Sequence, residues 1–152
     1  MKSVLHLTCF AAFLLASPLG AQTYNCALKD GRNSGWTPDK LMFEIVDGAK
    51  TARTYDPITY SIKGEMAEAN IATANSVRVS LGWKSGRYQN PNARPSRDFA
   101  GTGALPITFH ATLLRGGNKI LLRASPGGLN TFFSAKGACV ETSTRLEQLI
   151  DP

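Results

Sequence analysis

Residue types that commonly carry out catalysis are sparse in this chain of 152 residues. Beyond the first 21 residues there is one histidine, His110, and no Gly-x-Ser-x-Gly, His-Glu-x-x-His or phosphate-binding glycine motif. His110 occupies a polar position of an alternating segment, so we expect it to face solvent. Glu44, Glu65 and Glu68 are possible members of a glycosidase-like pair, but their spacing does not distinguish them from surface charge. We expect no catalytic residue, metal site or cofactor, and a small hydrolase is the least favoured function.

Cationic side chains are the clearest chemical asymmetry of the sequence. The segment 78–123 contains eight Lys and Arg residues and one acid, Asp98, in a chain of net charge +6. Aromatic residues stand among these cations, and such a mixture can stack on rings or bind anionic groups. A solvated surface that keeps a basic protein in solution is the alternative interpretation. The candidate ligand-binding residues are Trp83, Lys84, Arg87, Tyr88, Arg94 and Arg97.

The N-terminus is typical of a secretory signal peptide. Lys2 precedes an apolar run over residues 7–15, and a breaker with small residues follows at 18–22. Cleavage is predicted after Ala21, and a buried N-terminal helix is the alternative. The run is too short for a transmembrane helix, which needs about 18 apolar residues. We therefore expect a signal peptide at 1–21, a single domain at 22–140, a tail at 141–152, and a periplasmic or secreted protein without a transmembrane segment.

Two cysteines, Cys26 and Cys139, remain once the predicted signal peptide is removed. In an exported protein such a pair is most simply one disulfide bond. The bond would join the first predicted strand to the last. Two free thiols or two metal ligands are the alternative.

Alternating apolar and polar residues predict a succession of short strands. In segment 77–83 the apolar residues share one face, and Trp83 is predicted to pack inward as the last of them. Residues 66–74 would suit a helix by composition, but their short length favours a strand. The Asp47-Gly48 dipeptide predicts a type I′ hairpin turn, and Thr144-x-x-Glu147 resembles a capping box before a short C-terminal helix. Strands are predicted over residues 23–29, 41–46, 49–55, 58–62, 66–74, 77–83, 107–113, 120–124 and 131–134, with a closing segment at 137–139.

These elements predict an all-β fold, a small antiparallel β-barrel or β-sandwich of about seven to nine strands. A closed barrel is favoured because it leaves no exposed strand edge. The strand count and terminal disulfide resemble, in general outline, the small exported barrels that include lipocalin-like carriers and periplasmic lysozyme inhibitors. This resemblance assigns no role to any residue.

A basic, proline-containing loop over residues 84–106 is expected to project from this scaffold, and loops on rigid scaffolds commonly carry function. We therefore expect a non-enzymatic binding module of the cell envelope. It would present this loop to an anionic partner, which is a lipid head group, a cell-wall polymer or an acidic protein surface. Export argues against nucleic acid. A lipocalin-like carrier of a small apolar ligand is the alternative.

Overall fold

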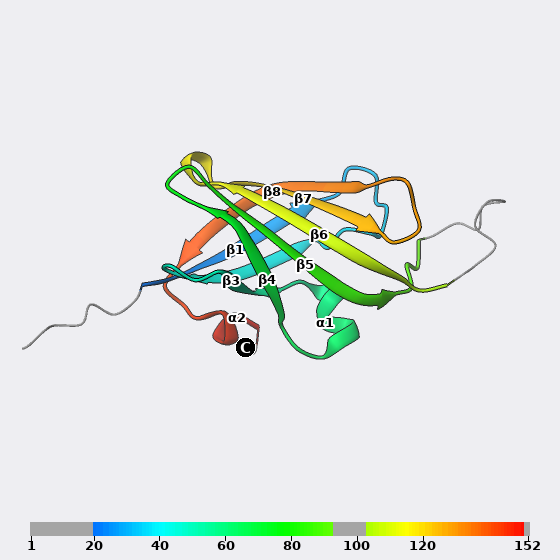
Figure 1. The fold of residues 1–152 in the computed structure, drawn as a ribbon. Coiled ribbons are helices and arrows are strands. Elements are labelled where there is room, and N and C mark those ends of the chain that lie inside the picture. Colours follow the sequence, from blue (N-terminus) through cyan, green and yellow to red (C-terminus); the bar gives the residue numbers. More distant parts are fainter. Residues whose placement is uncertain (1–19, 93–102, 151–152) are drawn as a thin grey trace, which may run out of the picture.

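Eight antiparallel strands close into a barrel in the computed structural model, which describes residues 20–92 and 103–150 (Figure 1). Each strand pairs with the next along the chain, and β8 pairs with β1. The prediction of an all-β fold is confirmed. Of the two predicted architectures, barrel and sandwich, the barrel is correct. Of the predicted signal peptide, residues 1–19 lie outside the described residues. The strands are β1 (Ala21–Lys29), β2 (Lys40–Val46), β3 (Thr51–Tyr55), β4 (Ala67–Ala74), β5 (Arg78–Tyr88), β6 (Leu105–Leu114), β7 (Lys119–Pro126) and β8 (Phe133–Thr142).

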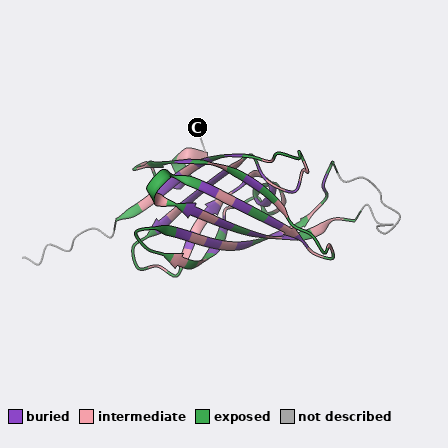
Figure 2. Ribbon diagram, turned by 90° about the horizontal axis from the view of Figure 1, so that it is seen from above, coloured by how far each residue is buried: buried purple, intermediate pink, exposed green. Residues whose placement is uncertain are grey.

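Alternation along the strands separates the barrel interior from its outer surface, because successive side chains of a strand point to opposite faces. Figure 2 shows this as alternating buried and exposed positions along the ribbon. Aromatic rings fill much of the interior: Tyr24 stacks on Phe43 with ring centroids 5.0 Å apart, and Trp83 stacks on Phe109 at 5.2 Å. Small inward residues such as Ala69 accompany these rings. The interior is therefore a packed hydrophobic core.

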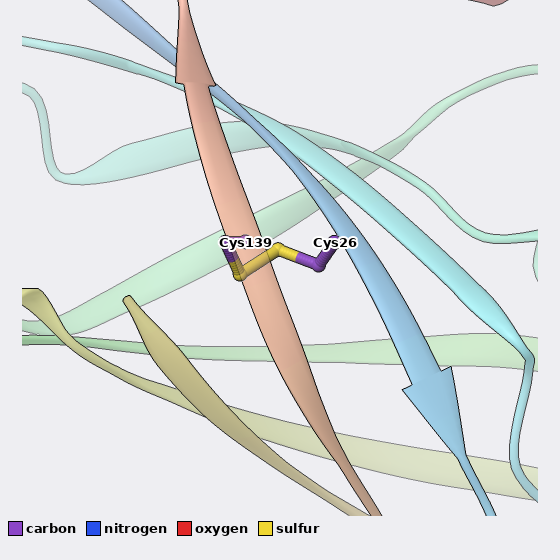
Figure 3. The surroundings of a disulfide bond; sticks show 2 residues. All are labelled: Cys26 and Cys139. Carbon is purple, nitrogen blue, oxygen red and sulfur yellow. A yellow bond between two sulfur atoms is a disulfide. The ribbon is translucent and has the colours of Figure 1, made fainter. Parts of the chain in front are cut away.

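The barrel is sealed where β1 meets β8. Cys26 and Cys139 are register partners in this pair, and a disulfide bond joins them, as predicted (Figure 3). The bond closes a sequence separation of 113 residues. In the chain-entropy model, a loop of this length contributes about 4 to 5 kcal/mol to stability through the unfolded state. Close to the bond, Gly137 lies so near β1 that a Cβ at this position would collide with the carbonyl oxygen of Ala27.

Segment 58–62, which was predicted to be a strand, belongs instead to a helix, α1 (Pro57–Lys63). The side chain of Asp56 caps its N-terminus by accepting a hydrogen bond from the Thr59 amide, and proline is favoured in the first turn. Gly64 ends the helix in the left-handed conformation, with φ of 72°. These capping signals outweigh the apolar alternation of the segment. The buried Ile58 then anchors α1 to the barrel core.

Two further expectations about turns and strands were wrong. The Asp47-Gly48 turn is not type I′, because Gly48 alone has positive φ; the Ala49 amide donates to the Val46 carbonyl at 3.0 Å. Strand 131–134 and closing segment 137–139 were predicted as separate elements. Residues 133 and 134 and the closing segment lie in one strand, β8, whereas residues 131 and 132 precede it. Gly137 does not interrupt this strand, because its missing side chain accommodates the close approach of β1.

The short C-terminal helix is present as α2 (Leu146–Ile150), but the predicted capping box is not formed. The Leu146 amide donates to a carboxylate oxygen of Glu44 on β2 at 3.0 Å, and Glu147 forms an ion pair with Arg53 on β3. Leu146 and Met42 are fully buried outside the interior cluster. The helix thus covers the outer surface of β2, and its N-terminus is capped from the barrel.

The up-and-down order places the chain connections at two opposite ends. One end, called the loop end, carries the connections 30–39, 56–66, 89–104 and 127–132. The other end, called the hairpin end, carries the connections 47–50, 75–77 and 115–118, and the last includes a short 3₁₀ helix, η1 (Arg115–Gly117). The described residues that directly follow β5, 89–92, therefore lie at the loop end.

Replacing Gly137 by alanine is expected to destabilise the barrel, because the new methyl group meets the backbone of β1 rather than a side chain able to move. Overpacking of this kind costs about 1 to 3 kcal/mol. Denaturant unfolding of the oxidised protein measures the effect. Gly116→Ala is the control, since no heavy atom lies within 4 Å of a Cβ at that position. Equal stability of the two variants would show that the seam has room to relax.

Candidate functional site

The first predicted ligand-binding residues lie in strand β5, which is longer than expected. The predicted loop 84–106 was expected to begin at Lys84, but β5 continues to Tyr88. After an irregularity between Lys84 and Arg87, pairing with β6 resumes at Arg87 and Tyr88. The hydroxyl of Ser85 bridges the irregularity, accepting from the Ile107 amide at 3.1 Å. Lys84 and Arg87 are exposed on the outer surface. Arg94 and Arg97 lie outside the described residues.

Trp83 points into the barrel, as its alternating position predicted. Its side chain is only 3% exposed. The indole Nε1 donates a hydrogen bond to a carboxylate oxygen of Asp56 at 2.9 Å. Trp83 therefore joins β5 to the start of α1 from inside the barrel. The outer surface of the candidate site is formed by other side chains.

Asp56 is a buried acid at the loop end, with 1% of its surface exposed. Burial raises the pKa of this carboxyl group, and hydrogen bonds from Thr59 and Trp83 oppose that rise. Two donors on different elements converge on Asp56, which links the helix cap to the core. The predicted strand over residues 58–62 gave no sign of this role.

Trp36, in the connection 30–39 between β1 and β2, is another residue whose role the sequence patterns did not indicate. It is buried, with 7% of its surface exposed, and stacks on Phe133 of β8 with ring centroids 6.0 Å apart. Its other neighbour is Tyr88 of β5, which it meets edge-on at 6.1 Å. Tyr88, a predicted ligand-binding residue, is therefore half-buried, and this burial raises the pKa of its hydroxyl. The single signal in the sequence was a tryptophan within a polar loop.

Asp30 holds the first connection of the loop end in a fixed conformation. Its carboxylate accepts hydrogen bonds from the Arg32 amide at 2.9 Å, from the amide and hydroxyl of Ser34, and from the Thr37 hydroxyl at 3.0 Å. Burial acts to raise the pKa of Asp30, but these hydrogen bonds prevail and lower it. The carboxylate is thus occupied by its own loop.

Asparagine side chains tie this connection to the beginning of the basic loop. Asn90 is buried and donates from Nδ2 to the Ser34 carbonyl at 2.8 Å, while its Oδ1 accepts from the Asn92 amide at 2.8 Å. Asn92 donates to the Asn33 carbonyl at 3.3 Å. Gly35, with φ of 74°, leaves the space that the Asn90 side chain occupies. The basic loop therefore starts from a rigid base.

A basic hollow of about 700 Å³ opens at the loop end between the connections 30–39 and 127–132. Lys29, Arg32 and Lys136 are cations of its lining, and Phe132 and Phe133 are its aromatic residues. Its acid is Asp30, which is already engaged by four donors. Lys29 and Lys136 are also register partners. Like charges facing each other across two strands are unfavourable, and a bound anion would relieve this repulsion.

Charge divides the described surface into two halves. From Arg78 to Thr142, the described residues include seven cations and one acid, Glu141, whereas residues 20–77 contain six cations and seven acids. Within residues 20–92 and 103–150, the one salt bridge joins Arg53 of β3 to Glu147 of α2. The cations between Arg78 and Thr142 are thus without an acidic partner in the part of the chain that the structure describes. The seven cations are Arg78, Lys84, Arg87, Arg115, Lys119, Arg123 and Lys136.

Residues considered for hydrolysis are not brought together. His110 lies exposed on β6, with Gly82 and Arg123 as register partners. Glu44 accepts from the amide that begins α2, whereas Glu65 and Glu68 are exposed elsewhere. No group of three potential metal-ligating side chains occurs among the described residues. In the same residues, no helix has the length and apolar character needed to cross a membrane.

Comparisons with protein-family models, with curated proteins and with solved structures gave no match to this chain.

The buried Asp56 leads to a prediction about pH and stability. Because burial raises its pKa in the folded state, the folded protein retains this proton at pH values where the unfolded chain has lost it. The contribution of Asp56 to the free energy of unfolding should therefore fall as pH rises from about 3.8 through the raised pKa. Urea unfolding of wild type and Asp56→Asn across this range measures that contribution as the difference between the two proteins.

Asp47→Asn makes the same change from carboxylate to amide in an exposed turn and is the matched control for effects unrelated to burial. The prediction would be contradicted if the free energy of unfolding of wild type, relative to that of Asp56→Asn, increased with pH. It would mean that the hydrogen bonds from Thr59 and Trp83 stabilise the ionised form more than burial destabilises it.

Proposed function

We propose that this protein is an exported, non-enzymatic binding module of the cell envelope that attaches to an anionic partner through its basic half. The contact surface is the loop end with the adjoining outer surface of β5. Lys84 and Arg87 provide described cations there, and Arg94 and Arg97 add charge in the same predicted loop. The partner class is a lipid head group, a cell-wall polymer or an acidic protein surface. The disulfide bond is compatible with a location outside the cytoplasm.

The uneven distribution of acids is the observation that carries this proposal. Surface cations are ordinarily interspersed with acids, and here seven described cations accompany one acid between Arg78 and Thr142. A surface of one sign raises the local concentration of oppositely charged partners and accelerates their association. The same charges weaken binding to cationic partners, which contributes to specificity.

Rigidity of the loop end supports the same function. Trp36, Asp30 and Asn90 fix the connection 30–39 and the first residues after β5 through stacking and hydrogen bonds. A surface that is ordered before binding loses less conformational entropy when the partner arrives. The cations near this base can therefore bind without first ordering the scaffold beneath them.

The carrier of a small apolar ligand is the weaker candidate. Its ligand would occupy the barrel interior, where stacked aromatic side chains already lie. Tyr24, Phe43 and Phe109 are each no more than 1% exposed. No observation among the described residues favours the carrier over the anion-binding module.

The proposal predicts salt-sensitive binding that depends on Lys84 and Arg87. Immobilised protein is exposed to envelope extract and washed with salt rising from about 0.1 M to about 1 M, over which the Debye length falls from about 10 Å to about 3 Å. The variant Lys84→Gln with Arg87→Gln should weaken retention about 2- to 30-fold at low salt, since each exposed ion pair contributes about 0.2 to 1 kcal/mol. Adding Arg94→Gln and Arg97→Gln should weaken it further.

Lys50→Gln with Arg145→Gln is the charge-matched control, because both cations are exposed and neither belongs to β5 to β8. It should retain the partner as wild type does. Melting curves of all variants should coincide, since exposed substitutions usually change stability by less than about 0.5 kcal/mol. Equal losses in the control and the β5 variant, or retention that ignores salt, would refute the proposed function.

A further inference from the structure

A second hollow lies on the outer surface of the barrel, over β6, β7 and β8. This outer groove has a volume of about 680 Å³ and is lined mainly by apolar surface. Leu114, Leu121 and Ala138 provide apolar side chains, and Lys119, Arg123 and Lys136 provide cations. No acidic residue belongs to the lining. Small-molecule sites commonly have this volume and this combination of apolar surface with a few polar groups.

Strand register places the apolar and cationic side chains of the outer groove in an ordered pattern. Along β7, outward positions alternate as Lys119, Leu121 and Arg123, with cations at both ends and leucine between them. Leu114 is the register partner of Lys119, and Lys136 is the register partner of Leu121. An apolar path therefore runs from Leu114 to Leu121. The path ends beside the cations Arg123 and Lys136.

Arg123 is held in place before any ligand binds. Its guanidinium carbon lies 4.9 Å from the ring centroid of Phe132, an arrangement in which the aromatic face attracts the cation. On its other side, Arg123 is the register partner of His110. The planar guanidinium can donate two parallel hydrogen bonds to a carboxylate or phosphate. An anionic group at this point would meet an oriented donor.

The apolar side chains of the outer groove are partly exposed, and a site for anionic charge alone would not require them. Leu114 is 49% exposed and Leu121 is half-buried. A highly hydrated polyanion would cover these side chains without gaining from their burial. An alkyl chain would bury them, and removing apolar surface from water favours binding. The groove thus fits a ligand with an anionic head and an apolar tail.

We propose that the outer groove binds a single-chain anionic amphiphile, such as a fatty carboxylate. The alkyl chain lies along Leu114 and Leu121, and the head group is bound by Arg123 and Lys136. This site shares Lys136 with the loop-end hollow but uses neither Lys84 nor Arg87, the cations on which the test of the proposed function depends. Its ligand is recognised one molecule at a time, which distinguishes it from attachment to a bilayer surface.

The test is calorimetric titration of the oxidised protein with dodecanoate below its critical micelle concentration. Butanoate carries the same head without the long chain, and dodecylphosphocholine carries the chain with a zwitterionic head. Dodecanoate should bind at least about 10-fold more tightly than either, because each lacks one half of the recognised chemistry. A tenfold change corresponds to about 1.4 kcal/mol.

Single substitutions test which groove residues bind the head group and which bind the alkyl chain. Arg123→Gln should weaken dodecanoate binding about 10-fold, and Leu121→Ser should weaken it by a similar factor. Lys84→Gln with Arg87→Gln should leave it unchanged, so the outcome is independent of the proposed function. Far-UV circular dichroism and melting curves identify any variant that fails to fold, and Leu114→Ser then replaces Leu121→Ser.

Three results would overturn the inference. One is the absence of dodecanoate binding, and another is binding that Arg123→Gln and the leucine variants leave unchanged. The third is binding to phosphatidylglycerol vesicles but not to monomeric dodecanoate, which would show that the face recognises a bilayer instead of one amphiphile.

Discussion

Closure of the barrel by the pairing of β1 with β8 is the constraint on which the rest of the structure depends. Once this pair forms, every second residue of each strand must fill an enclosed interior of limited width. The chain meets this requirement by combining rings such as Trp83 and Phe109 with small residues such as Ala69. Gly137 permits the close approach of the two strands, and the disulfide bond fixes their pairing. The outward residues are then free to vary in charge.

The two ends of the barrel have different roles. At the hairpin end, three short connections link successive strands. At the loop end, polar side chains replace strand pairing as the source of order: Asp56 joins α1 to Trp83, and Asp30 and Asn90 organise the neighbouring connections. A buried polar group that lacks a hydrogen-bond partner destabilises the folded state, so each of these hydrogen bonds favours a single conformation. This order gives the candidate binding surface a defined shape.

The alternation of apolar and polar residues, a local property, predicted the all-β class and the inward position of Trp83. The cysteine count predicted the disulfide that joins the first and last strands. The helix α1 was missed because its apolar residues also alternate, and the signals that decide it are caps at Asp56 and Gly64. Trp36 and Asn90 were beyond prediction. Their partners lie far away in the sequence, and no local pattern encodes which loops meet at one end of a barrel. The basic surplus was visible in composition, whereas its spread over the outer surface of β5 to β8 required the register.

The division of the surface into a basic half and a mixed half is the basis of the proposed function. Backbone amide chemical shifts, recorded while a short oligoglutamate is added to the isotopically labelled protein at low salt, test it most directly. Shift changes should concentrate on the loop end and on β5 to β8, where seven described cations accompany one acid between Arg78 and Thr142. They should reverse when salt is added, because screening weakens exposed charge interactions. Shift changes centred on β2 to β4, or spread evenly over the barrel, would contradict a basic half that recognises anionic partners.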